Sequence, residues 1–223
     1  MITLTEYSVD SNILKQAQDS LPYLGNDDKK MSLVLNEPTG NFFYDPWEIK
    51  TEFKNTVWET ILNSIPGPIG EARLIQLQHG TCYMSHCDID DRYHLNLEGQ
   101  YSFLIDIDSE EMFKTVADGK WYTINTGLRH VAANFGSIRR TQLVVRHLLT
   151  QANLKDPMTV KITPICENPR FEFDDIVSPW LHKINKANQL SDFTVLEDGV
   201  RFKVERGNLE SFPQDKFKVI VEQ

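Results

Sequence analysis

Apolar and polar residues alternate or recur at helical spacing along the first third of the chain. Residues 2–9 alternate as a strand would, and a short apolar stripe after Asp10 or Ser11 indicates a helix capped by one of these two residues. A turn-rich segment then leads into a second predicted strand at 31–35. The chain therefore opens with a strand, a helix and another strand.

The most regular helical spacing follows at residues 46–65. Its apolar positions are three or four residues apart, Pro46 stands where a helix begins, and the sequence Pro66-Gly67-Pro68 ends the pattern. We predict one helix over this whole range, packed lengthwise on a sheet.

From Glu71 onward the pattern changes to short strands separated by turn residues, which is typical of a β-barrel or sandwich. The sequence at 117–120, Ala-Asp-Gly-Lys, predicts a hairpin turn. Eight strands of this length favour a mainly β fold, a double-stranded β-helix (jelly roll, cupin-like) packed by an N-terminal helix. The predicted strands are 72–78, 81–88, 92–98, 101–107, 112–116, 120–124, 129–135 and 139–149.

The last third of the chain is less regular. We interpret 162–170 as a connection, 174–190 as a helix started or interrupted by Pro179, and 192–207 as a hairpin joined at Gly199, with an edge strand at 216–221. The expected organisation is a double-stranded β-helix domain at 1–150 that includes the N-terminal elements, and a small α+β extension at 151–223 that caps the barrel and is not independent.

Composition narrows the class of protein. Hydrophobic residues make up 40% and charged residues 25% of the chain, as in ordinary globular proteins. No apolar run is long enough for a membrane helix, the first residues do not resemble an export signal, and three cysteines suit a reducing compartment, so we expect a cytoplasmic location without membrane contact. A net charge of -9 disfavours nucleic acid as a partner and favours a small-molecule or peptide substrate.

Five of the six histidines fall between positions 79 and 147. His86 and Asp88 are two residues apart, so on an extended strand both side chains leave the same face, while Cys87 points to the other face and packs. With His130, they supply two neutral nitrogens and one carboxylate, the ligand set that leaves open positions on a non-haem ferrous ion. By itself, a pair such as His86 and Asp88, or a single strand histidine such as His130, more often has a structural role. The metal-site hypothesis therefore depends on the spacing of further residues.

That spacing is provided by Arg140, ten residues after His130 and inside an apolar strand, where an arginine needs an anion to be tolerated. Its guanidinium can hold a carboxylate in bidentate fashion. Arg139 would take this role if the strand register slipped by one, because such a shift exchanges the faces. Arg92 and His94 share another strand face and add two more hydrogen-bond donors aimed the same way.

Together, the order and spacing of these residues resemble the 2-oxoglutarate- and Fe(II)-dependent oxygenases, in particular the aspartyl/asparaginyl β-hydroxylase branch, which is related to bacterial hydroxylases of free proline. The match covers roughly Glu71 to Leu149 and includes Gly80-Thr81 before the first ligand, where His79 replaces the proline usual in the branch. The resemblance implies the cosubstrates 2-oxoglutarate and O2, with release of succinate and CO2.

The resemblance also implies roles. The iron ligands would be His86, Asp88 and His130, and Arg140 would bind the distal carboxylate of 2-oxoglutarate. Arg92 and His94 would lie near its 1-carboxylate or near the substrate. Four further residues line the substrate pocket or simply pack the barrel, two readings that the sequence does not separate: Trp121, Tyr122, Asn134 and Arg146.

Three functional hypotheses follow. The first is hydroxylation of an amino-acid side chain, in peptidyl Asp or Asn or in a free amino acid such as proline. The second is a non-catalytic cupin-like protein that binds a metal or a small acid, which needs neither Arg140 nor Arg92. The third treats the histidines as incidental to the fold.

Overall fold

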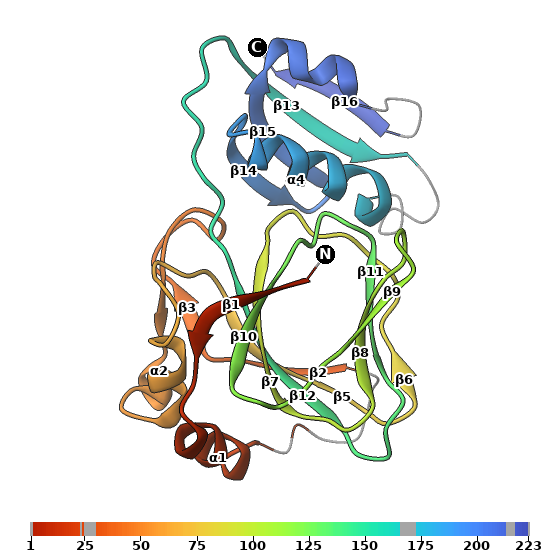
Figure 1. The fold of residues 1–223 in the computed structure, drawn as a ribbon. Helices are drawn as coiled ribbons and strands as arrows, with labels where there is room; N and C mark the ends of the chain where they lie inside the picture. Colours follow the sequence, from red (N-terminus) through yellow and green to blue (C-terminus); the bar gives the residue numbers. More distant parts are fainter. Residues whose placement is uncertain (1, 23, 25–29, 166–172, 213–216, 223) are drawn as a thin grey trace. The chain divides into compact units, whose positions relative to one another are not determined.

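The computed structural model describes residues 2–22, 24, 30–165, 173–212 and 217–222 (Figure 1). Part of the predicted connection at 162–170, including Cys166, lies outside them. Backbone contacts divide the chain into two compact units, one formed by residues 1–85 and 91–148, and the other by residues 86–90 and 149–223. No helix in the described parts is long and apolar enough to cross a membrane.

Eight strands of the first unit form a double-stranded β-helix, as predicted. Strands β5, β7, β10 and β12 belong to one sheet and β6, β8, β9 and β11 to the other, and the chain crosses between the sheets after every strand except β8, which pairs with the next strand, β9, the pattern of a jelly roll. The larger sheet has the order β1-β10-β7-β12-β5-β2 and the smaller β6-β11-β8-β9. The eight strands are β5 (Ala72–Leu77), β6 (Thr81–Cys82), β7 (Arg92–Glu98), β8 (Ser102–Asp106), β9 (Glu111–Lys114), β10 (Lys120–Ile124), β11 (His130–Asn134) and β12 (Arg140–Arg146).

The N-terminal elements extend and cover the larger sheet. Strand β1 (Ile2–Ser8) pairs with β10 and strand β2 (Lys30–Val34) with β5, so both edges gain a strand. Helix α1 (Ser11–Asp19) begins where predicted, because the Asp10 carboxylate accepts a hydrogen bond of 2.8 Å from the backbone N–H of Asn12. Figure 1 shows α1 and α2 (Val57–Leu62) on the outer side of the barrel.

The prediction of one helix over 46–65 is wrong. The segment forms strand β4 (Trp47–Ile49), which pairs with β3 (Asn36–Pro38), then the 3-10 helix η1 (Thr51–Phe53) and helix α2 (Val57–Leu62). Backbone groups of the first turn bond elsewhere, since the Trp47 N–H donates to Ile69 O at 3.0 Å. Asn55 has a φ of 58°, which no α-helix allows, and Thr56 then caps α2. Apolar spacing alone did not reveal these breaks.

Two strand predictions also need correction. The strand expected at 81–88 ends at Cys82, because its pairing with β11 is limited to two residues. The hairpin expected at 117–120 does not form, since β9 pairs with β8 in the smaller sheet while β10 pairs with β1 and β7 in the larger one. The turn instead carries the chain from one sheet to the other, and Gly119, with a φ of 78°, provides its left-handed residue.

The larger sheet has an apolar outer face and a more polar inner face. Outward side chains such as Leu95, Trp121 and Leu143 join α1 and α2 in the main core of this unit. Inward side chains face the smaller sheet, since Ile124 of β10 packs with Leu104 of β8 and Ala132 of β11. Because side chains alternate along a strand, the residues between the outward ones line the barrel.

The second unit contains a four-stranded antiparallel sheet with the order β14-β15-β13-β16. Trp180 of α4 packs on Phe202 of β15 and on Phe212, with ring centroids 5.7 and 5.0 Å apart. The predicted hairpin and edge strand are present, whereas the strand β13 was not predicted. The elements are β13 (Pro157–Pro164), the π-helix η2 (Phe173–Val177), α4 (Ser178–Lys186), β14 (Leu190–Leu196), β15 (Gly199–Glu205), the 3-10 helix η3 (Arg206–Ser211) and β16 (Phe217–Glu222).

Candidate metal centre

The three predicted metal ligands come together. One ligand atom each of His86, Asp88 and His130 lies within 4.8 Å of the other two, and His86 Nε2 is 3.7 Å from an Asp88 carboxylate oxygen. His86 forms an isolated bridge and Asp88 lies in the loop that follows, so the strand expected at 81–88 does not include these two residues.

The ring of His130 is oriented by the backbone. Its Nδ1 lies 2.9 Å from the carbonyl oxygen of Leu128, and a carbonyl can only accept, so Nδ1 carries the hydrogen. The second nitrogen, Nε2, then has a lone pair to offer a metal ion. This arrangement, in which one ring nitrogen donates and the other ligates, is the usual state of a metal-binding histidine.

Arg140 is a buried cation on the inner face of β12. Its side chain is 1% exposed, and burial lowers its pKa to about 10, so the guanidinium keeps its charge at neutral pH. Its one hydrogen bond within the described chain goes to the Gln142 side-chain oxygen, and no described carboxylate pairs with it. The phenol of nearby Tyr83 has a pKa raised by burial to about 12 and brings no negative charge.

The structure distinguishes Arg139 from Arg140. Arg139 points away from the barrel interior and donates from Nε to the Glu98 carboxylate at 2.8 Å, an ion pair of two partly exposed side chains. Arg140 faces inward, and its own Nε is buried without a hydrogen-bond partner. A buried cation with an unsatisfied donor is costly unless an anionic ligand meets it.

Two polar residues beside Arg140, Gln142 and Asn96, were not predicted. Gln142 follows Arg140 on the same face of β12 and is paired in register with Asn96 of β7, to which its amide nitrogen donates. Its oxygen also lies 3.2 Å from Nδ1 of His94. All four side chains are at least nine-tenths buried. The period-two spacing of Arg140 and Gln142, and of His94 and Asn96, was the available signal.

His94 is neutral in this environment. Burial, and then the positive charges of Arg140 and Arg92, hold the pKa of His94 well below its usual range. Arg92 shares the inner face of β7 with His94, as predicted from their spacing. The two residues therefore differ in charge, since one is a cation and the other a neutral ring.

The remaining residues predicted to line the pocket or pack the barrel make structural contacts. Asn134 holds the turn between β11 and β12, because its amide donates to Leu77 O and Ile138 O and accepts from the Gly136 N–H. The Arg146 guanidinium lies over the rings of Phe42 and Phe43, 4.9 and 5.0 Å from their centroids. The ring of Tyr122, on β10, packs against the ring of Phe113, on β9.

Trp121 lies in the core between the larger sheet and the helices and is fully buried. Its indole N–H donates to the Ser64 hydroxyl at 2.9 Å. Trp121 is thus a packing residue on the face opposite His94.

We predict that Trp121→Ala destabilises the protein by about 3–5 kcal/mol, because it removes a large buried ring. The unfolding midpoint in urea measures this. Tyr122→Ala, the next residue on the other face of β10, serves as the matched control and should cost less, since Tyr122 is only partly buried. An unchanged midpoint for Trp121→Ala would contradict the packing role.

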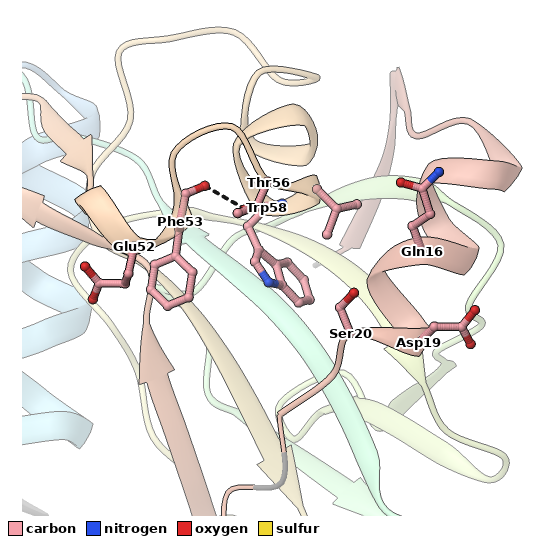
Figure 2. A pocket seen from close by; sticks show the side chains of 8 residues that line it. Gln16, Asp19, Ser20, Glu52, Phe53, Thr56 and Trp58 are labelled. Carbon is pink, nitrogen blue, oxygen red and sulfur yellow. Dashed lines mark hydrogen bonds between the residues drawn. The ribbon is translucent and has the colours of Figure 1, made fainter.

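A surface pocket of the barrel unit lies away from these residues. It has a volume of about 520 Å³ between α1 and the η1–α2 segment (Figure 2). Of its two acidic residues, Asp19 and Glu52, the first is paired with Lys15, and the Thr56 hydroxyl donates to Phe53 O at 2.6 Å. None of the predicted site residues lines it.

No family model matches the sequence. No curated protein matches it either. Among solved structures, the chain is similar to an oxidoreductase of the 2OG-Fe(II) oxygenase family from Burkholderia pseudomallei, with a TM-score of 0.46 and 13% identity over 65% of this chain and 84% of that one. A cupin domain from Bordetella pertussis matches with a TM-score of 0.32 and 13% identity over 37% and 84% of the two chains. A salicylate 1,2-dioxygenase from Pseudoaminobacter salicylatoxidans matches with a TM-score of 0.34 and 8% identity over 61% and 30%.

Proposed function

We propose that the protein is an Fe(II)- and 2-oxoglutarate-dependent oxygenase that hydroxylates an amino-acid side chain, in a peptide (Asp or Asn) or in a free amino acid such as proline. One observation carries the proposal. Arg140 is a fully buried cation in the barrel, without a carboxylate partner among the described residues. A ligand carboxylate would supply the missing anion.

The donor set fits a ferrous ion. His86, Asp88 and His130 offer two imidazole nitrogens and one carboxylate with ligand atoms within 4.8 Å of one another. Iron held by these residues would couple the oxidative decarboxylation of 2-oxoglutarate to hydroxylation, so that one atom of O2 enters succinate and the other the substrate. Three protein ligands leave positions for the cosubstrate.

In this proposal, residues of the chain bind and orient 2-oxoglutarate. Arg140 would hold the distal carboxylate of 2-oxoglutarate through a charge-assisted hydrogen bond, which a buried setting strengthens. Gln142 accepts a hydrogen bond from the guanidinium, and the apolar side chains Leu104, Ile124 and Ala132 form a buried cluster inside the barrel. Burial of this kind excludes water from the reacting groups.

Succinate formation tests the proposal. Purified protein with ferrous iron and 2-oxoglutarate is incubated in one arm with free amino acids, proline included, and in another with Asp- and Asn-containing peptides. We expect succinate and a substrate whose mass rises by one oxygen atom in one arm only. His86→Ala, which lacks one ligand, sets the background. Succinate at that background in both arms would contradict the proposal.

The alternative, a cupin-like protein that binds a metal or a small acid without catalysis, has its own signature. It predicts iron binding without turnover, and binding of 2-oxoglutarate that does not depend on Arg140. The same protein preparations distinguish the two, since calorimetry reports binding when no succinate forms.

A further inference from the structure

The orientation of the Gln142 amide is determined by Arg140. A guanidinium has only N–H donors, so the Gln142 atom that meets it must be the oxygen. The reverse orientation would place two donors against each other inside the barrel. The amide nitrogen then points to Asn96, whose side-chain oxygen accepts from it. Since all three side chains are buried, each of these bonds is costly to break.

The amide in turn determines the state of His94. The Gln142 oxygen is 3.2 Å from Nδ1 of His94, so Nδ1 must donate and therefore carries the hydrogen. Gln142 is the one described side chain hydrogen-bonded to this ring. The neighbouring charges of Arg140 and Arg92 oppose a second proton on it. Nε2 is left with a lone pair.

We infer that Arg140 and Gln142 hold His94 as the neutral tautomer with hydrogen on Nδ1, so that Nε2 accepts a hydrogen bond from a nitrogen or oxygen donor of the substrate. Gln142 is thus a positioning residue that acts through His94. This corrects the expectation that Arg92 and His94 are two donors. Arg92 donates, whereas His94 accepts.

The inference rests on the proposed function where it concerns the substrate, and it deepens that function. Neither carboxylate nor keto oxygen of 2-oxoglutarate donates a hydrogen bond, so a His94 that accepts has no partner on the cosubstrate. It selects a substrate with an N–H donor, such as the ammonium group of a free amino acid or the amide of a peptide. The resemblance implies that His94 lies near the 1-carboxylate of 2-oxoglutarate or near the substrate. A ring that only accepts at Nε2 fits the second of these positions.

Nitrogen NMR of histidine-labelled protein tests the tautomer directly. The metal-free, ligand-free wild-type protein at neutral pH is compared with His94→Gln, whose missing signals assign the ring. We expect the protonated-nitrogen signal at Nδ1 and the unprotonated signal at Nε2. Hydrogen on Nε2, or on both nitrogens, would overturn the inference whether or not the protein has oxygenase activity.

Two matched variants test the positioning role. Gln142→Met removes the acceptor at nearly constant volume, and we expect His94 to move largely to the Nε2–H tautomer. Gln142→Glu keeps an acceptor for both Arg140 and His94, and it should retain Nδ1–H. Circular dichroism confirms that each variant is folded. A tautomer unchanged in folded Gln142→Met would show that something other than Gln142 sets it.

The substrate part has a separate test. With iron and 2-oxoglutarate present, proline is compared with tetrahydrofuran-2-carboxylate, which has the same ring with an oxygen acceptor in place of the N–H donor. We expect the analogue to bind at least about 10-fold more weakly to the wild type, because it leaves Nε2 without a donor. A peptide substrate, if that arm is the active one, is compared with its N-methyl amide. Equal binding of the matched pair would overturn the substrate assignment and leave the tautomer result standing.

Discussion

Replacing Arg140 with methionine is expected to stabilise the folded protein and, at the same time, to remove most of its affinity for 2-oxoglutarate. The substitution deletes a fully buried charge that has no carboxylate partner in the described chain. Replacing buried charges by apolar side chains of similar volume often stabilises a protein by about 1–4 kcal/mol. The unfolding midpoint in urea, measured without ligand, should therefore rise.

The loss of affinity has the same cause. In the proposed complex, the carboxylate of 2-oxoglutarate would neutralise the Arg140 charge, and removing one partner of such a pair costs about 2–5 kcal/mol, roughly 30-fold to several thousand-fold in affinity. Calorimetry of the iron-loaded protein measures it. Unchanged affinity in Arg140→Met would remove the main support for the proposed cosubstrate.

Arg139→Met is the matched control, because it changes the adjacent residue of the same type. Arg139 pairs with Glu98 where both side chains are partly exposed, and such pairs contribute about 1 kcal/mol or less. The control should leave 2-oxoglutarate affinity unchanged and alter stability only slightly. If Arg139→Met loses affinity as much as Arg140→Met, the assignment of Arg140 is wrong.

The second large effect is expected from His130→Ala. His130 contributes one of the three grouped ligands, and its ring is already oriented by Leu128 O at 2.9 Å. Deleting a ligand should weaken iron binding by more than about 100-fold, since even residues that only orient ligands contribute 10- to 100-fold. Metal content after dialysis against ferrous iron measures the loss, and succinate formation should fall with it.

His79→Ala is the control for His130→Ala. His79 is exposed and lies outside the ligand group. Its replacement should leave iron content unchanged. Equal iron loss in both variants, or full iron content in His130→Ala, would contradict the metal centre.

Much of the barrel could be predicted because strand patterns have a period of two. The strands at 92–98 and 120–124 match β7 and β10, and the alternation of β7 placed Arg92 and His94 together on one face. His130 and Arg140 are ten residues apart because each begins one of two short strands, β11 and β12, that follow each other in the chain. These features depend on local alternation, which the sequence carries directly.

Other elements depended on groups distant in sequence. The helix expected at 46–65 breaks because its backbone bonds with Ile69 and Leu35, and the turn at 117–120 joins two sheets because β9 and β10 have different partners. The apolar spacing within each segment does not predict these long-range pairings. Long-range pairing overrides local propensity in such cases.

For the candidate site, the sequence by itself determined which residue types are available and which of them share a strand face. Only the tertiary structure decided that ligand atoms of His86, Asp88 and His130 lie within 4.8 Å of one another, that Arg140 and not Arg139 is the buried cation, and that Gln142 and Asn96 lie beside Arg140. The physical reason is that strand alternation is set within one segment, whereas the hydrogen bonds that orient Arg140, Gln142 and His94 require two strands in one register.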